Sequence, residues 1–176
     1  MRIAAMLVVV ACLGAQPAPA EPPSDAARAE MAKLSALAGK WRGAGWRMGR
    51  EGRSPFDSEE TIVAGLDGRA LIIEGRHYAA GTRESVHHAL AILAWDTAAG
   101  EYRLHSALAS GRTGSFPGRL EAPGRFVWTI QPANAPWSRF TMNFEEPDRW
   151  VEVGEMSRDG GRTWTKILEM TLARER

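Results

Sequence analysis

The feature that most constrains this chain is a change of residue pattern at Gly39-Lys40-Trp41. Before it, residues 26–38 repeat apolar side chains at helical spacing; after it, the period of alternation becomes two, as in strands with one buried face. The glycine lets the backbone bend into a first strand, and the indole can plug the narrow end of a barrel. We therefore predict one helix followed by a closed β-barrel.

Ten segments from Lys40 onward carry the strand pattern. Turn-forming clusters such as Leu66-Asp67-Gly68 and Ala122-Pro123-Gly124 separate them, so consecutive strands should be antiparallel neighbours. A sheet with that many strands tends to curl, and closure removes its unpaired edges. The predicted fold is all-β, an up-and-down antiparallel barrel of about ten strands. The expected strands are residues 40–48, 57–65, 69–79, 85–95, 101–109, 113–121, 125–131, 138–145, 149–157 and 163–174.

The first 20 residues have the positive charge, short apolar run and small-residue ending of a secretory signal peptide. We expect cleavage near Ala20 and export to the periplasm or the medium. Gln16 and Pro17 interrupt the apolar run, which disfavours a membrane-spanning helix. Lipid attachment at Cys12, which would anchor the product to a membrane, is the minor alternative.

The chain after the leader suits one domain, with residues 21–38 as linker and N-terminal helix and residues 39–176 as the barrel. Cleavage would remove Cys12, the single cysteine, so cysteine catalysis and disulfides are excluded. It would also remove Arg2, which lowers the 22 basic residues to 21 against 21 acidic ones. A formally neutral chain gives no reason to expect a nucleic-acid partner.

Seven tryptophans are too many for surface decoration, and most should be core. Barrels of eight or more strands can hold a small ligand, so a small apolar or amphipathic ligand in the interior is the leading hypothesis. The candidate ligand-binding residues are Phe126, Trp128, His77 and Tyr102. The alternative is a structural or protein-binding barrel filled by its own aromatic side chains. The helix, in turn, is either a lid over the mouth or a packing element at one end.

Metal and catalytic patterns are weak in this chain. His87 and His88 point to opposite sides of one strand, and no His-x-His or Glu-x-x-His spacing occurs, so we predict no metal site. We also predict no catalytic residues of a recognised type. An envelope enzyme with an unrecognised carboxylate site stays as a further alternative. Its candidates are Glu59, Glu60 and Glu74 beside His77.

Residues 37–45, Leu-Ala-Gly-Lys-Trp-Arg-Gly-Ala-Gly, resemble the opening of calycin-type barrels: lipocalins, fatty-acid-binding proteins and especially nitrobindin-like proteins. Residues 56–60 are similar to the nitrobindin-like second strand. The whole plan most resembles secreted bacterial calycin-like domains of unknown function. In lipocalins a late arginine packs across the first-strand tryptophan, and Arg174 is the matching position. The resemblance therefore implies a structural latch of Gly39, Trp41 and Arg174.

The same resemblance raises the question of haem, which nitrobindin-like proteins bind through a histidine near the C-terminus. Residues 163–176 contain no histidine, so the position of the axial ligand is empty in this chain. His77 is the most interesting replacement, since it shares a strand face with Leu71 and Ile73. Such a histidine is more often a core residue than a ligand, and we predict no cofactor.

Residues 157–164, Ser-Arg-Asp-Gly-Gly-Arg-Thr-Trp, match the Asp-box that sialidase-type propellers repeat. Only one copy is present. The motif is physically a hairpin in which the aspartate binds backbone amides and the tryptophan packs beneath the turn. We expect a turn motif and not a glycan site, made by Ser157, Asp159, Gly161, Thr163 and Trp164.

Overall fold

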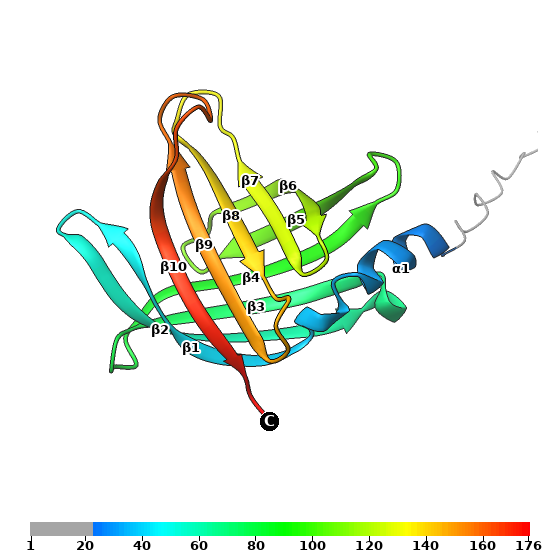
Figure 1. Cartoon of the computed structure of the whole chain (residues 1–176), viewed down its shortest axis with the longest axis horizontal. Coiled ribbons are helices and arrows are strands. Elements are labelled where there is room, and N and C mark those ends of the chain that lie inside the picture. The colour runs from blue at the N-terminus through cyan, green and yellow to red at the C-terminus, as the bar shows by residue number, and fades with distance from the viewer. Residues whose placement is uncertain (1–22) are drawn as a thin grey trace, which may run out of the picture.

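The computed structural model describes residues 23–176 and shows a closed barrel of ten antiparallel strands (Figure 1). Each strand pairs with the next along the chain, and β10 pairs with β1, so the barrel has no unpaired edge. This confirms the predicted fold class. The elements are α1 Asp25–Ala32, η1 Ser35–Leu37, β1 Gly39–Gly49, β2 Gly52–Gly65, η2 Leu66–Gly68, β3 Ala70–Ala79, β4 Ser85–Asp96, β5 Glu101–Leu108, β6 Thr113–Ala122, β7 Arg125–Ile130, β8 Trp137–Asn143, β9 Arg149–Ser157 and β10 Thr165–Arg174.

The N-terminal helix is shorter than the expected 26–38. Ser24 caps α1 by accepting the Ala27 N–H, and the α-helix gives way to the 3₁₀ turn η1. Side chains three residues apart fall on one side of a 3₁₀ turn, and Leu34 and Leu37 are both fully buried. The tighter turn thus aims both leucines at the barrel. Figure 1 shows α1 lying across one end of the barrel, where it contacts β3, β4 and η2.

Strand β2 begins five residues earlier than residue 57, where the sequence predicts its start. Its first part pairs with the end of β1 as far as Gly49 opposite Gly52. Pro55 and the charged residues before it give this part the composition of a loop. Pairing with β1 overrides that composition, and the Arg53 guanidinium lies 4.0 Å from the ring centre of Trp46 on the outer face.

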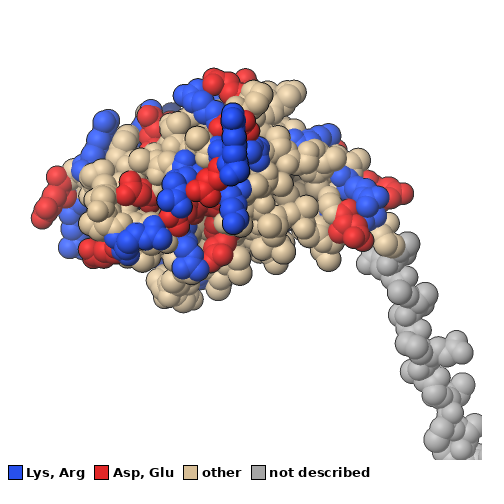
Figure 2. Space-filling view, turned by 90° about the horizontal axis from the view of Figure 1, so that it is seen from below, with Lys and Arg blue, Asp and Glu red and all other residues tan. Residues whose placement is uncertain are grey.

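The inner and outer faces alternate along the strands as the period-two pattern predicts. Thr141 alternates with the cavity residues Phe140 and Met142 and so faces outward, but it is only 6% exposed. Its partner across β7 is Val127, which is also buried, so part of the outer wall has an apolar neighbourhood. Elsewhere on the surface, Lys or Arg side chains lie next to Asp or Glu, as Figure 2 shows for one face.

No helix among residues 23–176 has the length and hydropathy needed to span a bilayer. The predicted leader and the lipid-attachment site at Cys12 lie outside the described residues.

Candidate ligand-binding cavity

The barrel encloses a cavity of about 590 Å³, to which all ten strands contribute side chains. Most of the lining is apolar, and a few polar groups converge on it. Pockets for small molecules typically have this size and composition. The interior is therefore not filled solid by its aromatic side chains, as the structural alternative required.

One end of the barrel is closed by Trp41, the first-strand indole. Its Nε1 donates a hydrogen bond of 2.8 Å to the Leu37 carbonyl oxygen, which joins β1 to η1. The Trp150 ring meets it edge to face at 5.9 Å, a favourable arrangement for two aromatic rings. Both indoles are about 2% exposed. Trp150 Nε1 is the buried side-chain nitrogen that has no hydrogen-bond partner within residues 23–176.

Arg174 lies over the other side of this plug. It is the register partner of Trp41 between β1 and β10, and its guanidinium carbon lies 4.1 Å from the indole centre. The same guanidinium donates to the carbonyl oxygens of Ala36 and Ala38, and to Asp148 at 2.9 Å. A Cβ on Gly39 would fall 2.4 Å from an Arg174 nitrogen, and the φ of Gly39 is +141°. Only glycine fits there without strain.

Tyr102 faces inward at this closed end and does not line the cavity. Its hydroxyl donates to the Glu30 carbonyl oxygen at 3.1 Å and to the Glu30 carboxylate at 3.0 Å, both on α1. Burial and these bonds raise the pKa of Tyr102 above its ordinary value. The side chain thus attaches the helix to the barrel, which supports the packing role of α1.

The cavity has an aromatic wall formed by β6, β7 and β8. The rings of Trp128 and Phe140 stack at 4.3 Å with 14° between their planes, and Phe116 lies 5.7 Å from Trp128. Phe126 lines the inner part of the same wall, at the closed end. Two of the predicted ligand-binding residues, Phe126 and Trp128, are therefore brought together here.

Glycines keep these rings flat against the wall. A Cβ on Gly118 would lie 2.4 Å from the Phe126 ring, and one on Gly154 would lie 2.9 Å from Phe140. Real Cβ atoms do not approach other atoms that closely, so any side chain at these positions would push a ring inward. The glycines thus explain why an interior rich in aromatic residues stays hollow.

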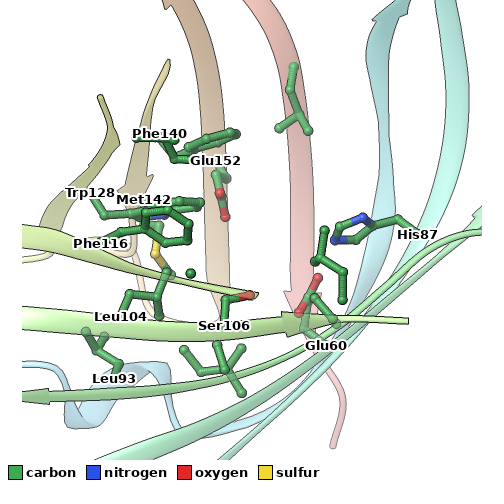
Figure 3. A pocket seen from close by; sticks show the side chains of 18 of the residues that line it. Glu60, His87, Leu93, Leu104, Ser106, Phe116, Trp128, Phe140, Met142 and Glu152 are labelled. Atoms are coloured by element: carbon green, nitrogen blue, oxygen red, sulfur yellow. The ribbon is translucent and has the colours of Figure 1, made fainter. Parts of the chain in front are cut away.

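A buried carboxyl, Glu60 on β2, enters the cavity from another side (Figure 3). The Ser58 hydroxyl donates to it at 3.3 Å, and His77 Nε2 lies 3.2 Å from the same oxygen. The carboxyl rests on Gly75, where a Cβ would fall 2.5 Å from Oε2. Burial raises the pKa of Glu60 to about 8, although the Ser58 hydrogen bond opposes this.

A second carboxyl, Glu152 on β9, points into the same space (Figure 3). It is 8% exposed and makes no side-chain hydrogen bond with any described residue. Its register partners are Met142 on β8 and Met170 on β10, both apolar. Burial, and then the nearby charge of Glu60, raise the pKa of Glu152 to about 8.

Two histidines complete the polar side of the cavity. The His77 ring stacks on Phe56 at 4.4 Å and lies 5.0 Å from the ring of His87. Burial lowers the pKa of each histidine to about 4, with the positive charge of Arg47 as a further cause for both. The two imidazoles and the two carboxyls are hence uncharged in the empty cavity at neutral pH.

The open end of the barrel is basic. Arg47, near the end of β1, and Arg112, in the turn between β5 and β6, both line the cavity and are exposed. Arg47 donates to the Val86 carbonyl oxygen at 3.3 Å, which directs it across the start of β4. A ligand therefore enters past two positive charges before it reaches the carboxyls.

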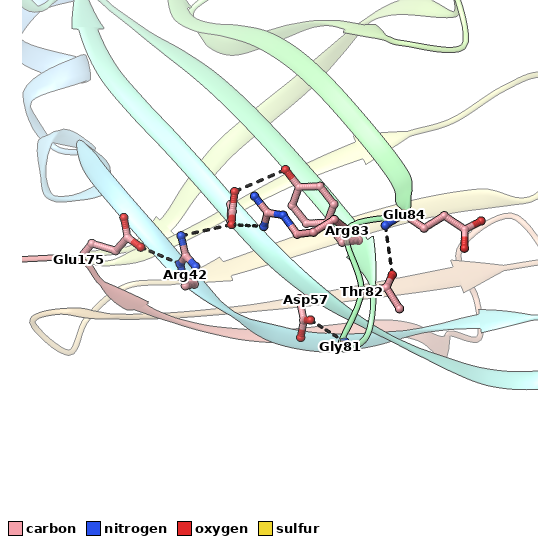
Figure 4. A network of polar contacts seen from close by, with 9 residues as sticks. Arg42, Asp57, Gly81, Thr82, Arg83, Glu84 and Glu175 are labelled. Atoms are coloured by element: carbon pink, nitrogen blue, oxygen red, sulfur yellow. Dashed lines mark hydrogen bonds and ion pairs between the residues drawn. The ribbon is translucent and has the colours of Figure 1, made fainter.

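The carboxylates proposed for an enzyme are not brought together. Glu59 lies on the outer wall, where it accepts from Arg83 at 2.8 Å and pairs with Arg42 at 3.2 Å; Figure 4 labels these two arginines. Glu74 is also outside and pairs with Arg76 and with His88, 2.9 Å away. Only Glu60 faces His77 in the interior, so this set cannot act on one substrate.

His77, the histidine that the sequence suggested, does not fit an axial haem ligand. Strand β10 contributes no histidine, and His77 has Nε2 engaged with Glu60 and its ring held against Phe56. An iron bond there would have to break this hydrogen bond. We therefore expect His77→Ala to leave any Soret band of haem added to the purified protein unchanged. Across residues 23–176, His, Cys, Asp and Glu side chains form no group of three suited to a metal ion.

The Asp-box segment lies outside the cavity, in the turn between β9 and β10. Asp159 accepts from the backbone N–H groups of Arg162 and Thr163 at 3.0 and 2.9 Å. The Ser157 hydroxyl accepts from the Gly161 N–H at 2.8 Å, and Trp164 Nε1 donates to the Gly161 carbonyl oxygen at 3.0 Å. The segment holds its own hairpin by these bonds.

Sequence reasoning missed Glu152, Arg47, Arg112 and the pair Phe116 and Phe140 as cavity residues. The signal for Glu152 was present in its alternation with Trp150, which places both on one strand face. No pattern in the sequence indicated that Glu152 and Glu60 would face the same cavity.

No protein-family model matches the chain, and no curated protein matches its sequence. Two solved structures share its fold. Rv2717c from M. tuberculosis is 17% identical, with a TM-score of 0.64 over 83% of this chain and 97% of that one. The S-type phycobiliprotein lyase CPES from Guillardia theta is 13% identical, with a TM-score of 0.56 over 85% and 93%. The chain therefore has a β-barrel fold of the calycin or lipocalin-like kind.

Proposed function

We propose that this protein binds a small amphipathic molecule inside its barrel. The observation that carries the proposal is the cavity of about 590 Å³, which is mainly apolar and which buried polar groups line on one side. Surfaces of this kind bury most of a small ligand and fix its orientation by a few polar contacts. The fold shared with the phycobiliprotein lyase is compatible with such a role.

The aromatic wall indicates a flat apolar part of the ligand. The rings of Trp128 and Phe140 stack face to face and both line the cavity, so a flat ring of a ligand can extend this stack. Flat hydrophobic molecules gain both buried area and ring stacking on such a surface. An aliphatic ligand would gain the buried area but no ring stacking.

The proposal is tested by titrating the protein with 1-pyrenemethanol, a neutral planar probe, and following energy transfer from tryptophan. We expect saturable binding of one probe per barrel. Replacing the stacked ring in Trp128→Ala should weaken binding about tenfold, since ring stacking contributes about 0.5–1.5 kcal/mol.

Trp46→Ala is the matched control, because Trp46 lies on the outer wall beneath Arg53. It should leave the affinity unchanged. Absence of saturable binding, or equal loss in both variants, would contradict an interior site.

We also propose that the mature protein works outside the cytoplasm, in the periplasm or the medium, after cleavage near Ala20. The residue pattern of the first 20 positions supports this. N-terminal sequencing of the protein from fractionated cells tests it: a start at Glu21 is expected, and a lipid-modified start at Cys12 would show anchoring instead.

A further inference from the structure

We propose that the cavity selects a ligand whose flat apolar body carries a protonated nitrogen group, an alkylammonium or amidinium, which binds between Glu152 and Glu60. This inference rests on the proposed function and specifies the chemistry of the ligand. It comes from Glu152, a buried carboxyl that faces the cavity and has no side-chain hydrogen-bond partner among residues 23–176.

Glu152 is buried without a side-chain hydrogen bond to any residue from 23 to 176. Buried polar side chains in native proteins are nearly always hydrogen-bonded, because an unpaired one loses its water without compensation. Glu152 is 8% exposed, makes no side-chain hydrogen bond with residues 23–176, and has methionines as its strand neighbours. Its carboxyl is directed into the cavity and stays accessible from it, so a ligand in that space can serve as its partner.

Glu60 is the second carboxyl that faces this cavity. Burial raises the pKa of both carboxyls, and repulsion by the charge of Glu60 raises that of Glu152 further. A cation between them removes the repulsion and lets them ionise. Carboxylates accept hydrogen bonds only, and N–H groups of a cation supply charge-assisted donors to both. Once these carboxyls are ionised, they repel a ligand carboxylate or phosphate at this depth.

The Glu60 carboxyl is held in position by its neighbours in the barrel wall. Ser58 and His77 hold its carboxyl at 3.3 and 3.2 Å, and Gly75 leaves the space that it occupies. Glu60 is therefore fixed before any ligand arrives, whereas Glu152 is free to take the stronger contact. The aromatic wall of Trp128 and Phe140 lines the same cavity and receives the flat body.

Binding should be linked to protons. The groups that face Glu60 are Ser58 on β2, His77 on β3 and Glu152 on β9; those next to Glu152 on β8 and β10 are apolar. Arg47 and His87 face His77 from β1 and β4. A cation that enters expels a carboxyl proton, so its affinity should rise about tenfold per pH unit between pH 6 and 8 and level off above.

The test uses three probes with one ring system: 1-pyrenemethylamine, 1-pyrenemethanol and 1-pyrenecarboxylic acid. At pH 8 we expect the amine to bind at least ~10-fold more tightly than the alcohol, as one charge-assisted pair would give. The carboxylic acid should bind more weakly than the alcohol. Calorimetry in buffers of different ionisation enthalpy should record proton release with the amine alone.

Glu152→Gln should remove the preference for the amine and leave the alcohol affinity within about twofold, because the amide keeps the shape and loses the charge. Glu152→Met, which continues the methionines on either side, provides a second variant that keeps an apolar interior. Glu155→Gln is the matched control. Glu155 lies on the same strand but pairs with Arg139 outside, at 2.7 Å.

If the alcohol binds and the amine binds no better, or if the acid binds best, this inference is overturned and the proposed function stands. If no probe binds, both are overturned. An amine preference that survives in both Glu152 variants would also overturn the assigned role of this carboxyl.

Discussion

The closed end of the barrel and its cavity differ in how their charged and hydroxyl side chains are bonded. At the closed end, the indole of Trp41, the guanidinium of Arg174 and the hydroxyl of Tyr102 have hydrogen-bond partners, and Trp150 packs edge to face on Trp41, although its own Nε1 has no partner within residues 23–176. In the cavity, Glu152 has no side-chain hydrogen-bond partner among residues 23–176 and feels the charge of a second buried carboxyl, Glu60. The difference indicates that the closed end stabilises the fold, while the cavity retains unfavourable burial for a ligand.

The largest effect on the free energy of unfolding is expected from a substitution at the closed end. Trp41→Ala removes a fully packed indole and its hydrogen bond, so the free energy of unfolding should fall by about 3–5 kcal/mol, as for other large core rings. Trp128→Ala should cost less than half as much, since Trp128 already borders empty space. Urea unfolding measures both. Equal losses would show that the two ends do not differ in stability.

The second effect is the pH dependence of stability. Both folded carboxyls have pKa values raised to about 8 against 4.5 unfolded, so the native state holds two protons that the unfolded state loses. The free energy of unfolding should therefore fall as pH rises from 6.5 to 8, by up to about 1.4 kcal/mol per pH unit for each group.

Below pH 6.5 the histidines act with the opposite sign. The pKa values of His77 and His87 are lowered to about 4, so between pH 4 and 6.5 the unfolded state binds more protons and stability gains from rising pH. Between pH 4.5 and 6.5, the contributions of the carboxyls and of the histidines to the free energy of unfolding therefore offset each other. The double variant Glu60→Gln and Glu152→Gln should lose the fall above pH 6.5 in urea unfolding. A slope that persists in it would exclude these carboxyls as its source.

A smaller effect on the free energy of unfolding is expected at the latch of Gly39, Trp41 and Arg174. Arg174→Met keeps the aliphatic contact with Trp41 and removes the cation and its bonds to the carbonyl oxygens of η1 and its flank. We expect a loss of about 1–2 kcal/mol in unfolding free energy, given typical cation–ring and charged hydrogen-bond contributions at a partly exposed site. Arg174→Lys should recover part of it. Probe affinity should not change in either variant.

The smallest effect lies in the β9–β10 turn. Asp159→Asn keeps the size of the side chain and weakens its hydrogen bonds with the Thr163 hydroxyl and with the backbone of Thr163 and Arg162. These bonds hold the pKa of Asp159 well below its usual range. A small decrease in Tm is expected by calorimetry, with probe affinity unchanged. A loss of affinity in this variant would mean that the turn takes part in binding.

Much of the fold could be predicted because it depends on local pattern and on chain ends. Period two from Lys40, with glycine-rich turns between runs, implies neighbouring antiparallel strands, and ten of them close. The pairing of Trp41 with Arg174 follows from closure, which sets the start of the first strand against the end of the last. The helix end was misplaced because η1 tightens to bury Leu34 and Leu37, a tertiary effect.

By itself, the sequence determined the closed antiparallel barrel, because alternation and turn chemistry act between residues close in the chain. The tertiary structure alone decided that the barrel is hollow, since this depends on rings lying flat over glycines of other strands, such as Phe126 over Gly118. It also decided that Glu60 on β2 meets Glu152 on β9. These strands are separated by β1 and β10 in the sheet, and only the curvature of the closed barrel turns their side chains toward one space.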